Sequence, residues 1–100
     1  MADVRLSAAA GADMRGIAAY TRDHWGTEQA LRYVVQLERA FKLLEKMPKV
    51  GRQLADLEGE YRKLQVGRHA IFYREDGDGV FVVRVLHERM LPSAHLFDPH

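Results

Sequence analysis

Two stretches in the N-terminal half of the chain repeat their apolar residues every three or four positions, the spacing of one helix face. The first begins after Ser7, a residue type that caps helix N-termini, and runs to Trp25, where Gly26 predicts an end. The second begins at Thr27, and its apolar positions form one stripe: Ala30, Tyr33, Val34, Leu37, Phe41, Leu44 and Met47. The pattern predicts an antiparallel helix pair. We expect Trp25 to close the pair over the core, and the alternative is that it anchors a partner, since tryptophan is enriched in binding hot spots.

A change of period after the second stripe predicts strands. Residues 49–60 lack periodicity and indicate a loop. Three segments rich in β-branched and aromatic residues follow, separated by short turns: Tyr61–Val66, His69–Glu75 and Val80–His87. A short segment, Val4–Leu6, is expected to add a strand at one edge. These elements predict an α+β fold, in which an N-terminal helix hairpin packs on a small antiparallel β-sheet built from a three-stranded C-terminal meander and a short N-terminal strand.

The last two strands also allow a prediction of which residues share a face. A symmetric turn at residues 76–79 would place Ile71 opposite Arg84, Phe72 opposite Val83 and Tyr73 opposite Val82. One face, expected to lie under the helices, then carries Ala70, Phe72, Phe81, Val83 and Val85. The other face carries His69, Ile71, Tyr73, Val82, Arg84 and Leu86. It mixes apolar and polar groups, so we expect a second chain to bind there, although a shift of one residue would exchange the faces.

The composition of the chain argues against several classes of function. The chain has 100 residues, enough for one domain spanning 1–100, and a net charge of +1, too weak for a strong nucleic-acid footprint over the whole chain. It has no cysteine and no long apolar run, so we expect a cytoplasmic protein without membrane contact. Its five histidines lack the spacing of metal ligands, and no glycine-rich nucleotide motif is present. We therefore expect no metal and no cofactor.

Two groups of side chains could carry chemistry. His69 and His87 fall near the open end of one hairpin and could act as an acid–base pair, but the predicted pairing puts them on opposite faces, which favours structural roles. Arg68, Arg74, Arg84 and Arg89 gather in and after the meander and could meet a protein partner, a DNA phosphate or acidic side chains. The alternative is a solvated strand edge, where charges discourage aggregation. Among these arginines we favour Arg84 for function, because its predicted face is partly apolar.

Several short motifs resemble one known family. They are the segments Asp23-His24-Trp25-Gly26 and Pro48-Lys49-Val50-Gly51, and the strands containing His-Ala-Ile-Phe-Tyr-Arg (69–74) and Arg-Val-Leu-His (84–87). In this order they resemble the ParE branch of the ParE/RelE toxin superfamily. The resemblance implies a bacterial type II toxin that inhibits DNA gyrase by protein–protein contact and is neutralised by a ParD-like antitoxin.

The resemblance also suggests where the partners bind. The antitoxin would cover the mixed strand face, namely His69, Ile71, Tyr73, Val82, Arg84 and Leu86. Gyrase would contact the end of the hairpin and the C-terminal tail, through Arg68, His87, Arg89, Met90, Leu91 and Leu96. No catalytic residue and no direct sequence-specific nucleic-acid binding are implied.

RelE-like members of the superfamily, which cut mRNA on the ribosome, are the alternative. They resemble this chain in fold and use an arginine on the middle strand, a second basic residue after the last strand and a tyrosine or histidine near the C-terminus. These positions fall on Ala70, near Glu88, and near His95 or Leu96. Because at most one of the three groups is present, we favour gyrase inhibition over RNA cleavage.

Overall fold

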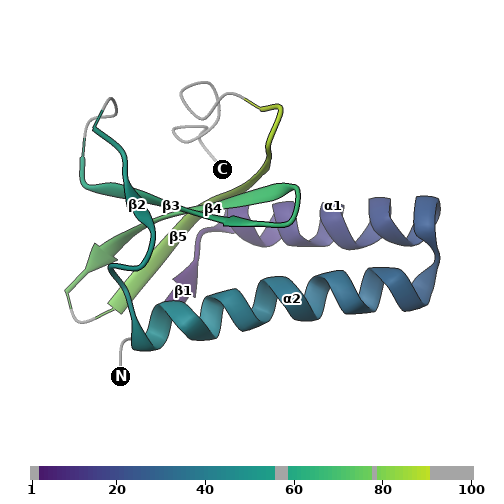
Figure 1. Cartoon of the computed structure of the whole chain (residues 1–100), viewed down its shortest axis with the longest axis horizontal. Helices are drawn as coiled ribbons and strands as arrows, with labels where there is room; N and C mark the ends of the chain where they lie inside the picture. Colours follow the sequence, from purple (N-terminus) through teal and green to yellow (C-terminus); the bar gives the residue numbers. More distant parts are fainter. Residues whose placement is uncertain (1–2, 56–58, 78, 91–100) are drawn as a thin grey trace.

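Two antiparallel helices cover one face of a five-stranded sheet in the computed structural model (Figure 1). The structure describes residues 3–55, 59–77 and 79–90. The helices are α1 (Ala8–Trp25) and α2 (Thr27–Lys46). The strands are β1 (Val4–Leu6), β2 (Arg52–Gln53), β3 (Tyr61–Val66), β4 (His69–Asp76) and β5 (Gly79–His87). The predicted α+β architecture of a helix hairpin on a sheet is therefore confirmed.

The helices begin and end where the sequence predicts. Ser7 caps α1, since its Oγ accepts a hydrogen bond from the N–H of Ala10 at 2.9 Å and donates one to the carbonyl of Val83 at 2.6 Å. Gly26, at a φ of 91°, reverses the chain between the two helices. This left-handed conformation suits glycine, because a side chain would be strained there. Neither described helix is long and apolar enough to cross a membrane.

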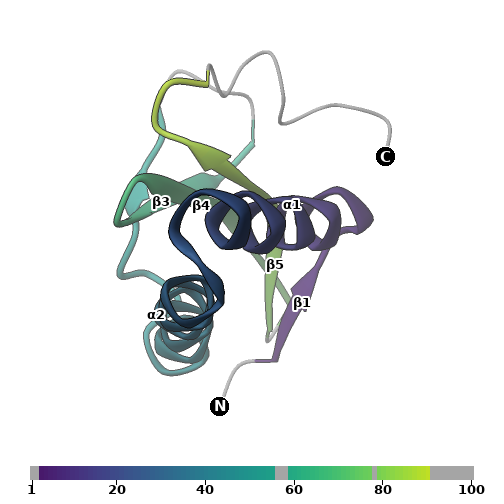
Figure 2. The ribbon, with the colours of Figure 1, turned by 90° about the vertical axis from the view of Figure 1, so that its right-hand side faces the viewer.

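The sheet has the strand order β1-β5-β4-β3-β2, and Figure 2 shows both helices on the same side of it. The strands β3, β4 and β5 form the predicted antiparallel meander. β1 lies at one edge, as predicted, but pairs with β5 in parallel, so the sheet is mixed and not wholly antiparallel. The predicted loop 49–60 contains the two-residue strand β2, which pairs with β3 and is too short to show a pattern in the sequence.

A β-bulge changes the pairing of β4 with β5. Tyr73 lies opposite Val82, as predicted, but Phe72 lies opposite Arg84 and Ile71 opposite Val85, which leaves Val83 as the extra residue. The predicted pairs Ile71–Arg84 and Phe72–Val83 are therefore wrong. The symmetric turn sets the register only from the turn to the bulge.

The predicted assignment of the two sheet faces is wrong for most residues, although Val85 lies under the helices and Leu86 on the opposite side, as expected. The core under the helices contains Ile71, Tyr73, Val80, Val82 and Val85, packed against Ile17, Leu37 and Leu44. Three residues expected to face the helices lie instead on the opposite side, where Ala70 and Phe72 form a second cluster with Leu86 and Val83 packs against it. Both faces of β4 and β5 are apolar, so alternation alone could not decide which one lies under the helices.

A buried tyrosine ties the chain after α2 to the sheet. The hydroxyl of Tyr73, on a side chain with no exposed surface, accepts a hydrogen bond from the N–H of Gly51 at 2.8 Å. A Cβ at position 51 would lie 2.6 Å from that hydroxyl, so only glycine allows this close approach. Burial raises the pKa of Tyr73, which keeps the hydroxyl neutral where it accepts this bond.

Candidate functional site

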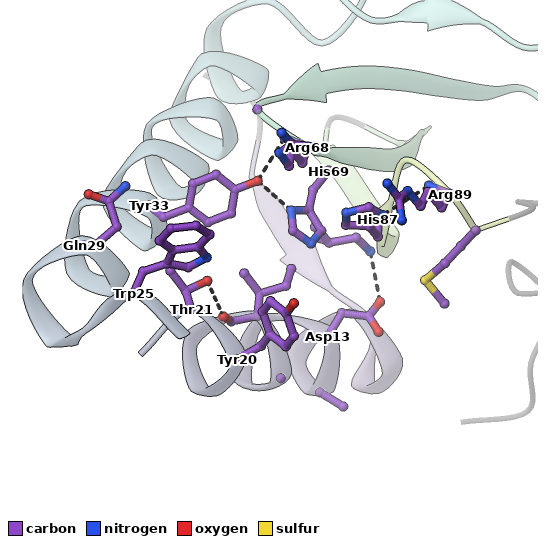
Figure 3. Close-up of a pocket in the computed structure, with 16 residues that line it drawn as sticks. Asp13, Tyr20, Thr21, Trp25, Gln29, Tyr33, Arg68, His69, His87 and Arg89 are labelled. Carbon is purple, nitrogen blue, oxygen red and sulfur yellow. Dashed lines mark hydrogen bonds between the residues drawn. The ribbon is translucent and has the colours of Figure 1, made fainter. Parts of the chain in front are cut away.

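A groove of about 1000 Å³ lies where α1 and the start of α2 meet the ends of β4 and β5 (Figure 3). One wall is α1, from Ala12 to Trp25, continued by Gln29 and Tyr33 at the start of α2. The other wall is the turn between β3 and β4 together with the end of β5, up to Met90. The two walls carry different chemistry.

Tyr33 of α2 joins the two walls. Its hydroxyl accepts a hydrogen bond from the N–H of Arg68 at 3.2 Å and lies 2.5 Å from Nδ1 of His69. The hydroxyl also donates to the carbonyl of Val66 at 3.4 Å, and the tautomer of His69 sets which of the two groups, hydroxyl or Nδ1, donates in their contact. Gly67 at the turn, with a φ of 57°, allows this contact, because a Cβ there would lie 2.8 Å from the tyrosine ring.

His69 and His87 face each other across β4 and β5. They are directly paired in the strand register, and their ring centroids are 5.3 Å apart in an edge-to-face arrangement (Figure 3). The prediction that they lie on opposite faces is therefore wrong, because the bulge brings them into line. Burial, together with the nearby His87, lowers the pKa of His69, while Asp13 and Glu88 oppose this shift.

Arg84, the arginine favoured for function, forms a structural ion pair. Its Nε and Nη2 donate to the two carboxylate oxygens of Asp13 at 2.8 and 2.9 Å, and the N–H of Val85 donates to the same carboxylate at 3.0 Å. The side chains of Arg84 and Asp13 are 10% and 14% exposed. Two parallel charge-assisted bonds in this setting lock α1 to β5, so the interpretation of Arg84 as an accessible contact is wrong.

The position of Asp13 in the sequence is a signal for this ion pair. Asp13 lies four residues before Ile17, on the side of α1 that packs on the sheet. A carboxylate on the buried side of a helix needs a cationic partner, because an isolated buried charge is costly. Asp13 could therefore have been matched with a sheet arginine from the sequence alone.

The predicted gyrase contacts that the structure describes come together on one rim. Arg68, His87, Arg89 and Met90 all line the groove, although they come from two segments. Arg68 makes an exposed ion pair with Glu88 at 3.4 Å, and the N–H of Arg89 donates to Nδ1 of His87 at 3.2 Å. The other two predicted contacts, Leu91 and Leu96, lie outside the described residues, as do His95 and the rest of the tail.

The predicted antitoxin surface is mostly inaccessible. Ile71, Tyr73 and Val82 have no exposed surface, and Leu86 is 1% exposed. Together with the buried Arg84, these residues contribute to the two cores or to the ion pair, so the prediction that this face is open to a second chain is wrong. Of the predicted set, His69 keeps the largest accessible fraction of its surface, in the groove, and Arg84 keeps about a tenth of its side chain exposed.

The wall formed by α1 exposes two aromatic rings. Trp25 is 71% exposed and Tyr20 is 61% exposed, and both line the groove. The prediction that Trp25 closes the helix pair over the core is wrong. Tyr20 stacks on His24 with a centroid distance of 3.9 Å, and the Nδ1–H of His24 donates to the carbonyl of Tyr20 at 2.8 Å. These exposed rings are typical of a contact surface.

The groove combines binding groups with one potential proton-transfer pair. The imidazoles of His69 and His87 could exchange a proton with a ligand, and the guanidiniums of Arg68 and Arg89 could hold an anion. Within residues 3–55, 59–77 and 79–90, no three histidine, aspartate or glutamate side chains gather closely enough to hold a metal ion.

Comparisons with known proteins agree on one family. The family model described as "ParE toxin of type II toxin-antitoxin system, parDE" matches residues 4–92. The chain is 43% identical over 86 residues to Toxin ParE1 of Mycobacterium tuberculosis H37Rv, covering 85% of this chain and 88% of that protein. It is 38% identical over 96 residues to Toxin ParE1 of Caulobacter vibrioides, covering 96% of this chain and 99% of the relative.

A solved structure confirms the architecture. The chain matches one from the structure titled "Chromosomal ParDE TA system from P. aeruginosa" with a TM-score of 0.76, covering 87% of this chain and 96% of that one. The two sequences are 20% identical, so this likeness supports the fold alone.

Proposed function

Because this chain belongs to the ParE toxin family of type II toxin–antitoxin systems, we propose that it stops bacterial growth by inhibiting DNA gyrase through protein–protein contact. The observation that carries the proposal is the convergence of Arg68, His87, Arg89 and Met90 on one rim of the groove. Arginine is enriched in interface hot spots, and an apolar neighbour excludes water from such a contact. The toxin itself would then supply a surface and no bond-making group.

The mechanism we infer is stabilisation of the complex in which gyrase holds cleaved DNA. In such a mechanism the DNA break is made by gyrase, and the toxin contributes only binding energy to one state of the enzyme. The exposed rim suits this role, because its cations do not need to be withdrawn from a buried ion pair before binding.

Growth assays with rim variants test the contact surface. Induced expression of the chain should arrest growth, and Arg89→Gln combined with Met90→Ser should relieve the arrest, because the rim loses an exposed cation and its apolar neighbour. Arg39→Gln on the exposed side of α2 is the matched control and should remain toxic. Full toxicity of the rim variant at equal protein level would contradict the proposal.

We also propose that a ParD-like antitoxin neutralises this toxin, and we move its predicted surface to the C-terminal end of α2 and its cap residue Met47. Leu43 and Met47 are 38% and 53% exposed and lie one helical turn apart, beside the basic Lys42 and Lys46. An antitoxin segment with apolar and acidic side chains would complement this patch. The cognate antitoxin should raise the melting temperature of the toxin, and Leu43→Ser/Met47→Ser should reduce that rise.

The His69–His87 pair favours one second candidate, ribosome-dependent cleavage of mRNA. Two imidazoles with centroids 5.3 Å apart, beside exposed arginines, could supply an acid, a base and a cation for phosphate chemistry. Cuts at defined codon positions in a cell-free translation reaction, absent in His87→Asn, would support this candidate. Intact mRNA would contradict it.

A further inference from the structure

The two walls of the groove carry different groups, which together suit a ligand with an anionic part and a flat aromatic part. The strand wall presents the cations Arg68 and Arg89 and the imidazole of His87, while the α1 wall presents the flat rings of Tyr20 and Trp25. We propose that this groove binds a nucleotide, with its phosphate on Arg68, His87 and Arg89 and its base against Trp25 and Tyr20. This goes beyond gyrase inhibition, because it assigns a small ligand to the toxin alone.

The cations of the strand wall are available to an anion. The guanidinium of Arg89 makes no ion pair or hydrogen bond within the part of the chain that the structure describes, and that of Arg68 makes only an exposed pair with Glu88. Exposed ion pairs are weak, so a phosphate can replace the carboxylate at little cost. Arginine is suited to this role because its planar fork matches phosphate oxygens.

The carboxylate of Asp13 in the groove wall does not repel such a ligand strongly. Asp13 already accepts three hydrogen bonds, two from the guanidinium of Arg84 and one from the N–H of Val85. Its charge is therefore compensated, and its oxygens are directed toward β5 (Figure 3). The basic character of the opposite rim remains.

The rings of the α1 wall are placed for stacking. The fold does not bury Trp25 or Tyr20, so their large apolar faces remain exposed to solvent. His24 stacks on one face of Tyr20, and this contact restricts the ring and lowers the entropy lost when a base packs nearby. Stacking on aromatic rings is the general way in which proteins hold a base without reading its identity.

The α1 wall of the groove leaves room for the ligand. It includes the small, exposed residues Ala12 and Gly16, and a Cβ at Gly16 would meet nothing within 4 Å. The volume of about 1000 Å³ is at the upper end of that found for small-molecule sites. A side chain at position 16 therefore begins in open space, and a larger one would occupy part of the groove beside the α1 wall.

Fluorescence of Trp25, the single tryptophan of the chain, gives a direct test. Adenosine 5′-monophosphate (AMP) should quench this fluorescence with a saturable curve, and shifts of the His69 and His87 imidazole resonances should follow the same curve. Adenosine lacks the phosphate, and inorganic phosphate lacks the base. Each should bind about tenfold more weakly than AMP, or weaker still, since one charge-assisted contact is worth about that factor. Equal affinity for adenosine and AMP would overturn the phosphate assignment.

Three variants separate this site from nonspecific binding. Arg89→Gln should weaken AMP binding about tenfold, and Gly16→Leu should abolish it while the melting temperature stays equal or rises, because glycine is a poor helix residue. Arg39→Gln, outside the groove, should bind as the unmodified chain does. Unchanged binding in both groove variants would overturn the proposal.

The same assay identifies the source of the nucleotide. A short single strand with a 5′-phosphate is compared with AMP and with the same strand lacking the phosphate. Tighter binding of AMP indicates a free nucleotide, and tighter binding of the phosphorylated strand indicates a strand end. Both outcomes support the site, and the absence of saturable binding by either ligand overturns it. Because no gyrase is present, failure here is distinct from failure of gyrase inhibition.

Discussion

The arginines near the groove are held in opposite ways. Arg84 is buried and donates two short hydrogen bonds to Asp13. Arg68 and Arg89 lie on an open rim, where the one ion pair found among the described residues is the exposed pair of Arg68 with Glu88. A buried pair of this kind fixes an orientation and is unavailable to a partner, while exposed cations contribute little to folding and remain available. The comparison separates the arginine that holds the fold together from those that we assign to binding.

The largest expected effect is loss of the buried pair. Asp13→Ala should lower the free energy of unfolding by about 3 kcal/mol, because the buried Arg84 loses its carboxylate partner. Denaturant unfolding measures the change. Asp23→Ala is the matched control, since its pair with Arg22 is exposed, and a loss of about 0.5 kcal/mol or less is expected there. Similar losses in the two variants would remove the distinction between buried and exposed pairs.

The next effect concerns the link between the walls. Tyr33→Phe should lower the free energy of unfolding by about 1–2 kcal/mol, because the N–H of Arg68 and Nδ1 of His69 lose their partner. Tyr20→Phe, whose hydroxyl makes no hydrogen bond within the described ranges, should leave stability almost unchanged. Thermal unfolding of the two variants side by side checks this, and equal melting temperatures would refute the role of the Tyr33 hydroxyl.

A smaller effect should appear as a pH dependence. The pKa of His69 is lowered in the folded chain by burial and by the nearby His87, although Asp13 and Glu88 act in the opposite direction. The unfolded chain therefore binds the proton first, and stability should decline as the pH falls below the ordinary value of 6.5. His69→Gln should reduce this slope in denaturant titrations between pH 7.5 and about 5. An unchanged slope would show that another group is responsible.

The smallest effect on stability belongs to the open rim. Arg89→Gln should change the free energy of unfolding by about 0.5 kcal/mol or less, because its side chain is exposed and makes no ion pair within the described part of the chain. If binding is the role of the rim, this variant keeps its melting temperature and loses affinity for its ligands. A large loss of stability would instead show that Arg89, like Arg84, holds the fold together.

The comparison also shows what could be predicted from the sequence. The apolar stripe of α2 and the β-branched segments are enough to predict the helices and strands. Burial of one helix face gives the sequence a period of 3.6 residues, and strands are marked by β-branched and aromatic residues that alternate between two faces. The bulge at Val83 leaves no such trace, and it alone decides whether His69 meets His87. Exposure of Trp25 was equally hidden, since a tryptophan at a helix end suits a core or a contact surface.

The most direct test of the central claim uses one preparation of the purified chain in two reactions. We predict loss of DNA supercoiling by gyrase with accumulation of cleaved DNA, while mRNA on programmed ribosomes stays intact. Arg89→Gln should restore supercoiling at the same toxin concentration, and Arg39→Gln should not. Normal supercoiling together with codon-positioned mRNA cuts would contradict gyrase inhibition and assign the His69–His87 pair a catalytic role.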